Sequence, residues 1–107
     1  MIVRNETREC DVVSPGVARK ILACGGGLMM VQVFFDKGAV GAVHTHPHQQ
    51  VSYVLSGAFE LEMDGTKEVV RAGDTFYVPS AVPHGVVALE PSVIVDVFTP
   101  QRQDFLK

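Results

Sequence analysis

The sequence predicts an all-β protein whose strands form a sandwich or a barrel. Along its 107 residues, helical periodicity is scarce, and short apolar or alternating segments recur between Gly, Pro and Asp residues. Asp64-Gly65, between Met63 and Thr66, is typical of a two-residue hairpin turn, because both turn positions require positive φ. Many short strands at regular spacing, joined by such turns, are typical of sandwiches and barrels.

Nine segments have the length and composition of β-strands. They cover residues 17–24, 29–36, 42–46, 50–55, 59–63, 67–71, 75–78, 85–89 and 93–98. The three glycines at 25–27 are interpreted as a flexible connection between two strands, since a phosphate-binding loop would need a lysine and a following helix. The tail, 99–107, is mainly polar, and we expect it to form a short helix or to contact a neighbouring subunit.

Length and composition predict one globular domain spanning residues 1–107. The apolar fraction of 47% and the charged fraction of 20% are ordinary for such a domain. The net charge is −3, and Lys and Arg are scattered, which argues against a nucleic-acid partner. No apolar run approaches the roughly 20 residues of a membrane-spanning helix, so no membrane partner is expected.

The N-terminal residues and the two cysteines indicate a reducing compartment. The segment MIVRNETREC becomes polar within a few residues and lacks the apolar region of a signal peptide, so we expect a cytoplasmic protein. Cys10 and Cys24 form no CxxC pattern. They are expected to be free, mostly buried thiols and not a disulfide.

Three of the four histidines lie close together, in the sequence HTHPH. If His44 lies in a strand, the two-residue spacing places it and His46 on the same face. Pro47 has no N–H to donate, so the chain is expected to turn there and to re-enter a strand at Gln50. Two imidazoles and an amide oxygen that converge from adjacent strands form most of a divalent metal site.

The fourth histidine, His84, follows a second strand that is bounded by Pro79 and Pro83. A lone histidine is ordinarily a half-buried structural residue. Because an incomplete cation site needs another donor, we assign His84 as the remaining ligand. His48 is expected in the turn, where it supports a ligand or serves as a spare one.

Asp96 interrupts an otherwise apolar run, VIVDVF, where a buried, unpaired carboxylate would be costly. Asp96 and Phe98 have the same strand parity, so both point into the barrel if either does. The functional interpretation is a carboxyl group in a dry cavity beside a cation, suited to proton transfer. The alternative is that Asp96 faces solvent and breaks the alternation.

Two segments share the spacing pattern of one protein superfamily. The first, 38–57, contains Gly38, His44, His46, Gln50 and Gly57. The second, 73–88, contains Gly73, Pro79 and His84. These segments resemble the paired motifs of the cupins, although Gln50, Ala81 and Ala88 replace the usual glutamate, glycine and asparagine. The resemblance implies a single-domain cupin jelly-roll β-barrel that holds one divalent metal ion through His44, His46, Gln50 and His84.

The resemblance extends to one cupin subfamily, from about residue 17 to residue 106. The segments LMMVQVFF, GAVGAVHTHPHQQVSYVLSG, GDTFYVPSAVPHGVV and DVFTPQRQDFL are similar to those of the pectin-degradation cupins, the unsaturated pyranuronate lyases. Those enzymes convert 4,5-unsaturated monouronates from pectin or alginate to linear 5-keto-4-deoxyuronates. In that subfamily an Asp, a Phe and an Arg near the last strand act in catalysis, which implies those roles for Asp96, Phe98 and Arg102.

The implied reaction assigns a task to each of these side chains. Asp96 carries the proton, Arg102 clamps the substrate carboxylate through its two-pronged guanidinium, and Phe98 packs on the sugar face. Gln32 and Tyr53 are further candidates for the cavity lining. The ligand set suits Ni, Zn, Mn, Fe or Co, and the sequence does not choose among them.

Two alternative functions and one assembly are also considered. A cupin dioxygenase would need iron and an open coordination position, and a non-catalytic sugar-binding cupin would need no proton carrier. The neutral amide of Gln50, in place of a glutamate, favours Lewis-acid chemistry over oxygen activation.

An open edge strand near the N-terminus predicts a homodimer, because small cupins otherwise expose unpaired backbone groups.

Overall fold

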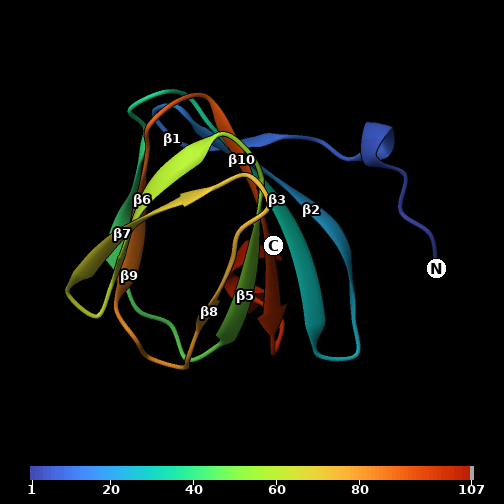
Figure 1. Ribbon diagram of the computed structural model, residues 1–107. Helices are drawn as coiled ribbons and strands as arrows, with labels where there is room; N and C mark the ends of the chain where they lie inside the picture. Colours follow the sequence, from blue (N-terminus) through green and yellow to red (C-terminus); the bar gives the residue numbers. More distant parts are fainter. Residues whose placement is uncertain (107) are drawn as a thin grey trace.

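The computed structural model describes residues 1–106 and consists of two antiparallel β-sheets that curve around a shared interior (Figure 1). The larger sheet has the order β1 (Asp11–Ser14), β2 (Val17–Gly25), β3 (Leu28–Phe35), β10 (Ser92–Thr99), β5 (Gln49–Ser56) and β8 (Thr75–Val78). The smaller sheet has the order β4 (Val40–His44), β9 (His84–Ala88), β6 (Ala58–Met63) and β7 (Thr66–Arg71). Short 3-10 helices, η1 (Asn5–Thr7) and η2 (Gln103–Phe105), lie near the two ends. The predicted all-β architecture is confirmed.

All nine expected strands are present, with bounds that differ from the expected ones by no more than two residues. The expectation for residues 42–46 was wrong in one respect. β4 ends at His44, so His46 lies in the β4–β5 connection and not on the strand. β1 was not expected, because its four residues, DVVS, contain no clear alternation of apolar and polar side chains.

The turns follow the residues that the sequence offers for positive φ. Asp64 and Gly65 have φ values of 50° and 81°, which confirms the β6–β7 hairpin. The glycines at 25–27 all have positive φ and connect β2 to β3, as expected. The tail forms the 3-10 helix η2, which matches the expected short helix.

The core is built by side chains that alternate along the strands towards the interior. One cluster of buried apolar residues comprises Val17, Phe35, Val54, Phe59, Ala88 and Ile94. A second cluster comprises Met29, Val31 and Phe98. On β10, Ile94 and Phe98 belong to different clusters, and Asp96 lies between them on the same inner face. The strand therefore places one carboxyl group inside an apolar wall.

Both cysteines are free, as expected, but Cys10 is exposed and only Cys24 is partly buried. Cys10 lies before the first strand and outside both core clusters, which corrects the expectation of two buried thiols. Within residues 1–106, no helix has the length and apolarity needed to cross a membrane.

Candidate metal centre

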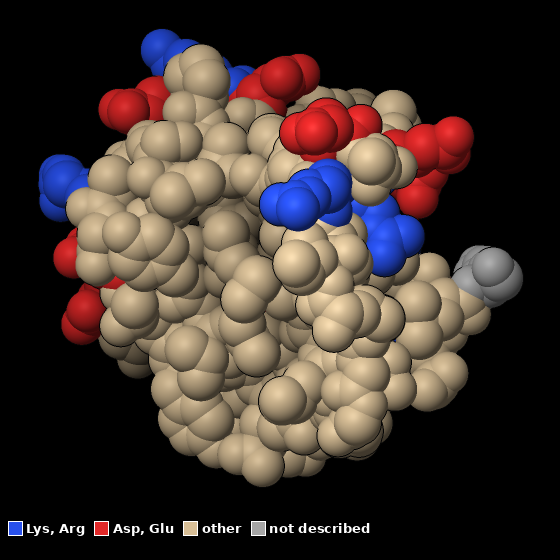
Figure 2. Space-filling view, turned by 90° about the vertical axis from the view of Figure 1, so that its right-hand side faces the viewer, with Lys and Arg blue, Asp and Glu red and all other residues tan. Residues whose placement is uncertain are grey.

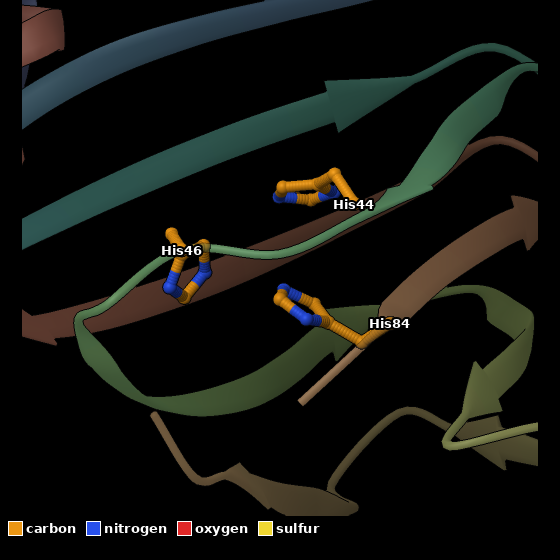
Figure 3. Close-up of side chains that lie close together, drawn as sticks. All are labelled: His44, His46 and His84. Carbon is orange, nitrogen blue, oxygen red and sulfur yellow. The ribbon is translucent and has the colours of Figure 1, made fainter. Parts of the chain in front are cut away.

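Three imidazole rings converge at one end of the barrel (Figure 3). His44 ends β4, His46 follows in the connection to β5, and His84 begins β9. One nitrogen from each ring lies within 4.8 Å of the others. His46 and His84 are buried and His44 is exposed, so the group is open to solvent on one side. Three such nitrogens can hold a metal ion.

Strand pairing explains why His84 meets His44 although they are far apart in sequence. The two residues are direct partners in the antiparallel β4–β9 ladder. Gly85, the next residue, permits this close approach. A Cβ on Gly85 would lie 2.8 Å from the backbone oxygen of Gly41 and 2.8 Å from the backbone nitrogen of Val43. The absence of a side chain at Gly85 thus keeps β9 against β4.

Each imidazole is oriented by a backbone carbonyl. Nδ1 of His44, His46 and His84 lies 2.8, 3.0 and 2.9 Å from the carbonyl oxygens of Ala42, His48 and Val82. A neutral ring that donates from Nδ1 has its lone pair on Nε2. The three contacts therefore assign the tautomer in which Nε2 is available to a metal ion, the arrangement typical of metal-bound histidine.

The amide oxygen of Gln50 lies beside the imidazoles. Gln50 Nε2 donates to Ser52 Oγ at 2.9 Å, so Oε1 faces the imidazoles and lies 3.0 Å from His46 Nε2. If His46 donates from Nδ1, two lone pairs face each other across that distance. A bound cation would convert this unfavourable contact into two coordinate bonds.

Burial favours the neutral form of the imidazoles, as metal binding requires. It lowers the pKa of both His46 and His84. Nε2 of His84 is also buried without a hydrogen-bond partner in the structure. A buried polar atom of this kind requires a partner, and an ion between the three rings would supply it. The residues present therefore fit a divalent metal ion.

His48 lies outside this group of potential ligands, among the residues that the structure describes. Its backbone oxygen accepts the hydrogen bond from His46, so it supports a ligand through the main chain. Its ring lies 5.5 Å from the His46 ring. Of the two roles expected for His48, the structure favours the supporting one.

Asp96 lies beside Gln50 on the inner face of the larger sheet. Its Oδ1 accepts a hydrogen bond from Ser52 Oγ at 2.6 Å and one from Gln50 Nε2 at 3.3 Å. Burial raises the pKa of Asp96 to about 6, and the bond from Ser52 opposes that shift. The solvent-facing alternative for Asp96 is thereby wrong.

A cavity of about 360 Å³ opens from this group into the barrel. That volume lies near the lower end of the range of about 300–1,000 Å³ for small-molecule sites. Its lining includes His44, Gln50, His84, Asp96, Phe98 and Arg102. Among the described residues that line it, Asp96 supplies the one carboxyl group. The cavity is large enough for one small molecule.

Phe98 and Arg102 adjoin the same cavity, but each already has partners. Phe98 is buried, and its ring lies edge to face with His46, at 5.7 Å between centroids. Arg102 donates from Nε and Nη2 to the two carboxylate oxygens of Asp104, at 3.1 and 2.8 Å. This hydrogen bonding lowers the pKa of Asp104. The guanidinium therefore has a counterion of its own in this structure.

Sequence reasoning misplaced two residues and missed one. Gln32 and Tyr53 were expected in the cavity, but Gln32 hydrogen-bonds the exposed Asn5 and Tyr53 lies on the outer face of β5. Ser52, which is completely buried and joins Gln50 to Asp96, was not singled out. It has the same strand parity as Gln50, and that parity is the feature that could have identified it.

Comparison with known proteins agrees with the fold. Residues 31–98 match the cupin domain family. The chain belongs to this family, and its fold is the expected cupin β-barrel.

Three relatives are similar over most of the chain, and two of them narrow the family further. The pectin degradation protein KdgF of Dickeya dadantii (strain 3937) is 45% identical over 98 residues, which cover 90% of this chain and 89% of that protein. KdgF from a Halomonas species has a solved structure with 45% identity and a TM-score of 0.94, covering 98% of this chain and 97% of that one. An RmlC-like cupin from Shewanella frigidimarina NCIMB 400 gives 42% identity and a TM-score of 0.94, covering 97% and 94%. The chain is thus a pectin-degradation cupin by similarity.

Proposed function

We propose that this protein is a metal-dependent enzyme that opens the ring of 4,5-unsaturated monouronates from pectin or alginate, yielding 5-keto-4-deoxyuronates. The observation that carries the proposal is the convergence of three imidazole nitrogens and one amide oxygen beside Asp96, in a cavity sized for one sugar. Similarity to two KdgF proteins supports uronate breakdown as the setting.

The metal ion would be held by His44, His46, Gln50 and His84. All four are neutral, so a divalent ion would keep its full charge, and Ni, Zn, Mn, Fe and Co all suit such a site. Bound there, it would supply Lewis acidity to the oxygen that becomes negative as the ring opens.

The reaction is an isomerisation and needs no oxidant or reductant. The C1 hydroxyl loses its proton, the C1–O5 bond breaks, and a proton is added at C4. Asp96 is the proposed proton carrier, since it is the one carboxyl group among the described residues that line the cavity. Ser52 Oγ donates a hydrogen bond to Oδ1 of Asp96 at 2.6 Å. This bond fixes the orientation of the carboxyl group, and so the direction in which its other oxygen can exchange a proton.

Arg102 and Phe98 are proposed to position the substrate. Arg102 uses two of its five N–H groups on Asp104, so three remain to bind a substrate carboxylate. Phe98 offers an apolar face in the cavity, next to His46. A sugar ring packed there would lie near both the proposed metal ion and Asp96.

The experiment that tests the function follows the ultraviolet absorbance of the conjugated double bond. Purified, metal-loaded protein is mixed with unsaturated galacturonate freshly generated by a pectate lyase. The proposal expects the absorbance to fall faster than in a protein-free control. A rate equal to the spontaneous one contradicts the proposal. Oxygen consumption by iron-loaded protein would favour the dioxygenase alternative instead.

A homodimer is also proposed. β1 is an edge strand of the larger sheet, and its outer ladder is unpaired within residues 1–106. On the outer face of that sheet, Tyr77, Val51, Val97 and Met30 are ladder partners in one row across four strands. Figure 2, which views the side where β2 and β3 lie in Figure 1, shows a broad area without charged side chains. An uncharged sheet face of this kind suits a second copy of the chain.

The single domain over 1–107 and the cytoplasmic location stay predictions.

A further inference from the structure

A second arginine, Arg19, lines the cavity. It lies on β2, opposite Val33 of β3, and both side chains line the cavity that also contains Asp96 and Arg102. Its neighbour Lys20 points to the other side of the sheet and donates to Asn5 Oδ1 at 2.9 Å. Arg19 is therefore the cation that β2 directs inward.

The guanidinium of Arg19 is placed by an aromatic ring. Its Cζ lies 3.6 Å from the centroid of Phe105, and Cζ of Arg102 lies 4.3 Å from the same centroid. Phe105 in turn lies edge to face with Phe98, at 5.8 Å. Both arginines thus rest on one aromatic side chain that adjoins the proposed sugar-binding surface, and such stacking orients a guanidinium.

Arg19 has no ion-pair partner at this end of the cavity among the described residues. Arg102 is paired with Asp104, whereas Arg19 forms no ion pair and donates no side-chain hydrogen bond among the residues that the structure describes. Asp104 and Asp11 act on Arg19 only over longer distances, and burial together with Arg102 lowers its pKa. The nearby carboxyl groups are Asp11, Asp96 and Asp104, and none of them forms an ion pair with Arg19 among the described residues. The N–H groups of Arg19 are therefore available to a further carboxylate.

We propose that Arg19 is a second positioning residue for the substrate, which binds the uronate carboxylate together with Arg102. The inference rests on the proposed function and deepens it, since it assigns recognition of the acidic group to two arginines. A carboxylate has two oxygens with about four acceptor positions, enough for both guanidinium groups. The site would select uronates over the corresponding neutral sugars.

The test compares Arg19→Gln with Arg19→Lys and with Lys20→Gln, all metal-loaded. Lys20→Gln removes the same charge from the adjacent position on the outer face. For Arg19→Gln we expect KM for unsaturated galacturonate to rise about tenfold while kcat changes less than about twofold, because a charge-assisted hydrogen bond of this kind is lost. Arg19→Lys should recover part of the loss, and Lys20→Gln should behave like the wild type. Thermal unfolding checks that each variant is folded.

A binding measurement separates this proposal from the proposed function. Calorimetry with D-galacturonate and D-galactose should show a preference of the wild type for the charged sugar that Arg19→Gln weakens about tenfold. If the wild type prefers the charged sugar and Arg19→Gln weakens that preference, but the wild type does not open the ring, the proposed function is wrong and the role of Arg19 stands. If it opens the ring and Arg19→Gln leaves both KM and the preference unchanged, the role of Arg19 is wrong and the function stands.

Discussion

Ser52 Oγ lies 2.6 Å from Asp96 Oδ1 and accepts a hydrogen bond from Gln50 Nε2 at 2.9 Å. The hydroxyl therefore joins the proposed proton carrier to the proposed amide ligand. Because the NH₂ of Gln50 is engaged there, its oxygen faces His46. Ser52 and Asp96 are direct partners in the β5–β10 ladder, so the sheet itself holds this relationship in place.

Replacing Ser52 by Ala should weaken the metal site although Ser52 is no ligand. Gln50 would lose the acceptor that sets its orientation, and changes around metal ligands typically cost 10- to 100-fold in metal affinity or activity. Titration of the metal-free variant by calorimetry checks the affinity. Ser52→Thr keeps the hydroxyl and should restore most of it. Equal affinities for wild type and Ser52→Ala would contradict this linkage.

Replacing Asp96 by Asn should abolish ring opening while leaving sugar binding intact. Asn has nearly the same shape and still accepts the bond from Ser52, but it does not exchange a proton at neutral pH. We expect kcat to fall by about 10²- to 10⁴-fold, the usual contribution of general acid–base catalysis. Metal content and D-galacturonate affinity serve as controls. Full activity of Asp96→Asn would remove Asp96 from the mechanism.

The convergence of the three imidazoles could be predicted because spacing and residue type both point to it. His44, His46 and Gln50 lie within one short segment, and an incomplete site required His84. The register that makes His44 and His84 ladder partners could not be predicted, since it depends on how β4 and β9 pair within the smaller sheet and not on either strand alone. The same holds for His46, whose place beyond the end of β4 depends on where the ladder stops.

The contacts of Arg102 and Arg19 were harder to predict than the convergence of the three imidazoles. Arg102 pairs with Asp104 two residues away, in a 3-10 segment that has no sequence periodicity to reveal the contact. Arg19 lies on an edge-proximal strand, and its contact with Phe105 depends on where the tail folds back. Strand parity predicts which way a side chain points, but not which distant segment covers it.

Removing the metal should lower both activity and thermal stability. A ligand at 100 times its Kd stabilises the native state by about 2.7 kcal/mol, which for a domain of this size raises Tm by roughly 10 °C. Chelator-treated protein should therefore gain Tm when Mn, Fe, Co, Ni or Zn is added back. His84→Ala should lose this gain, whereas His48→Ala, which alters a ring outside the ligand group, should keep it. Identical Tm shifts for the two variants would contradict the assignment of His84.

Replacing Asp104 by Asn should improve substrate binding. The change leaves one acceptor oxygen in place of two, so it frees one N–H group of Arg102, and it removes a negative charge near the proposed carboxylate site. The Asp104 side chain is 57% exposed, so the pair contributes only about 0.2–1 kcal/mol and the fold should tolerate its loss. We expect KM to fall about twofold to fivefold. Glu90→Gln removes an exposed carboxylate elsewhere and serves as the control; an unchanged or higher KM for Asp104→Asn would contradict the role of Arg102.

Replacing Val51 by Lys should convert the proposed dimer to a monomer. Val51 is 49% exposed and lies in the apolar row between Tyr77 and Val97, so the monomer has no need to bury it. A charge placed there would have to be desolvated in a dimer, which is costly without a partner. Light scattering after gel filtration should give twice the chain mass for the wild type and the chain mass for Val51→Lys. Val69→Lys, a residue 44% exposed on β7 of the other sheet, should remain dimeric. A wild type that is monomeric at all concentrations would show that this face has no second copy to bind.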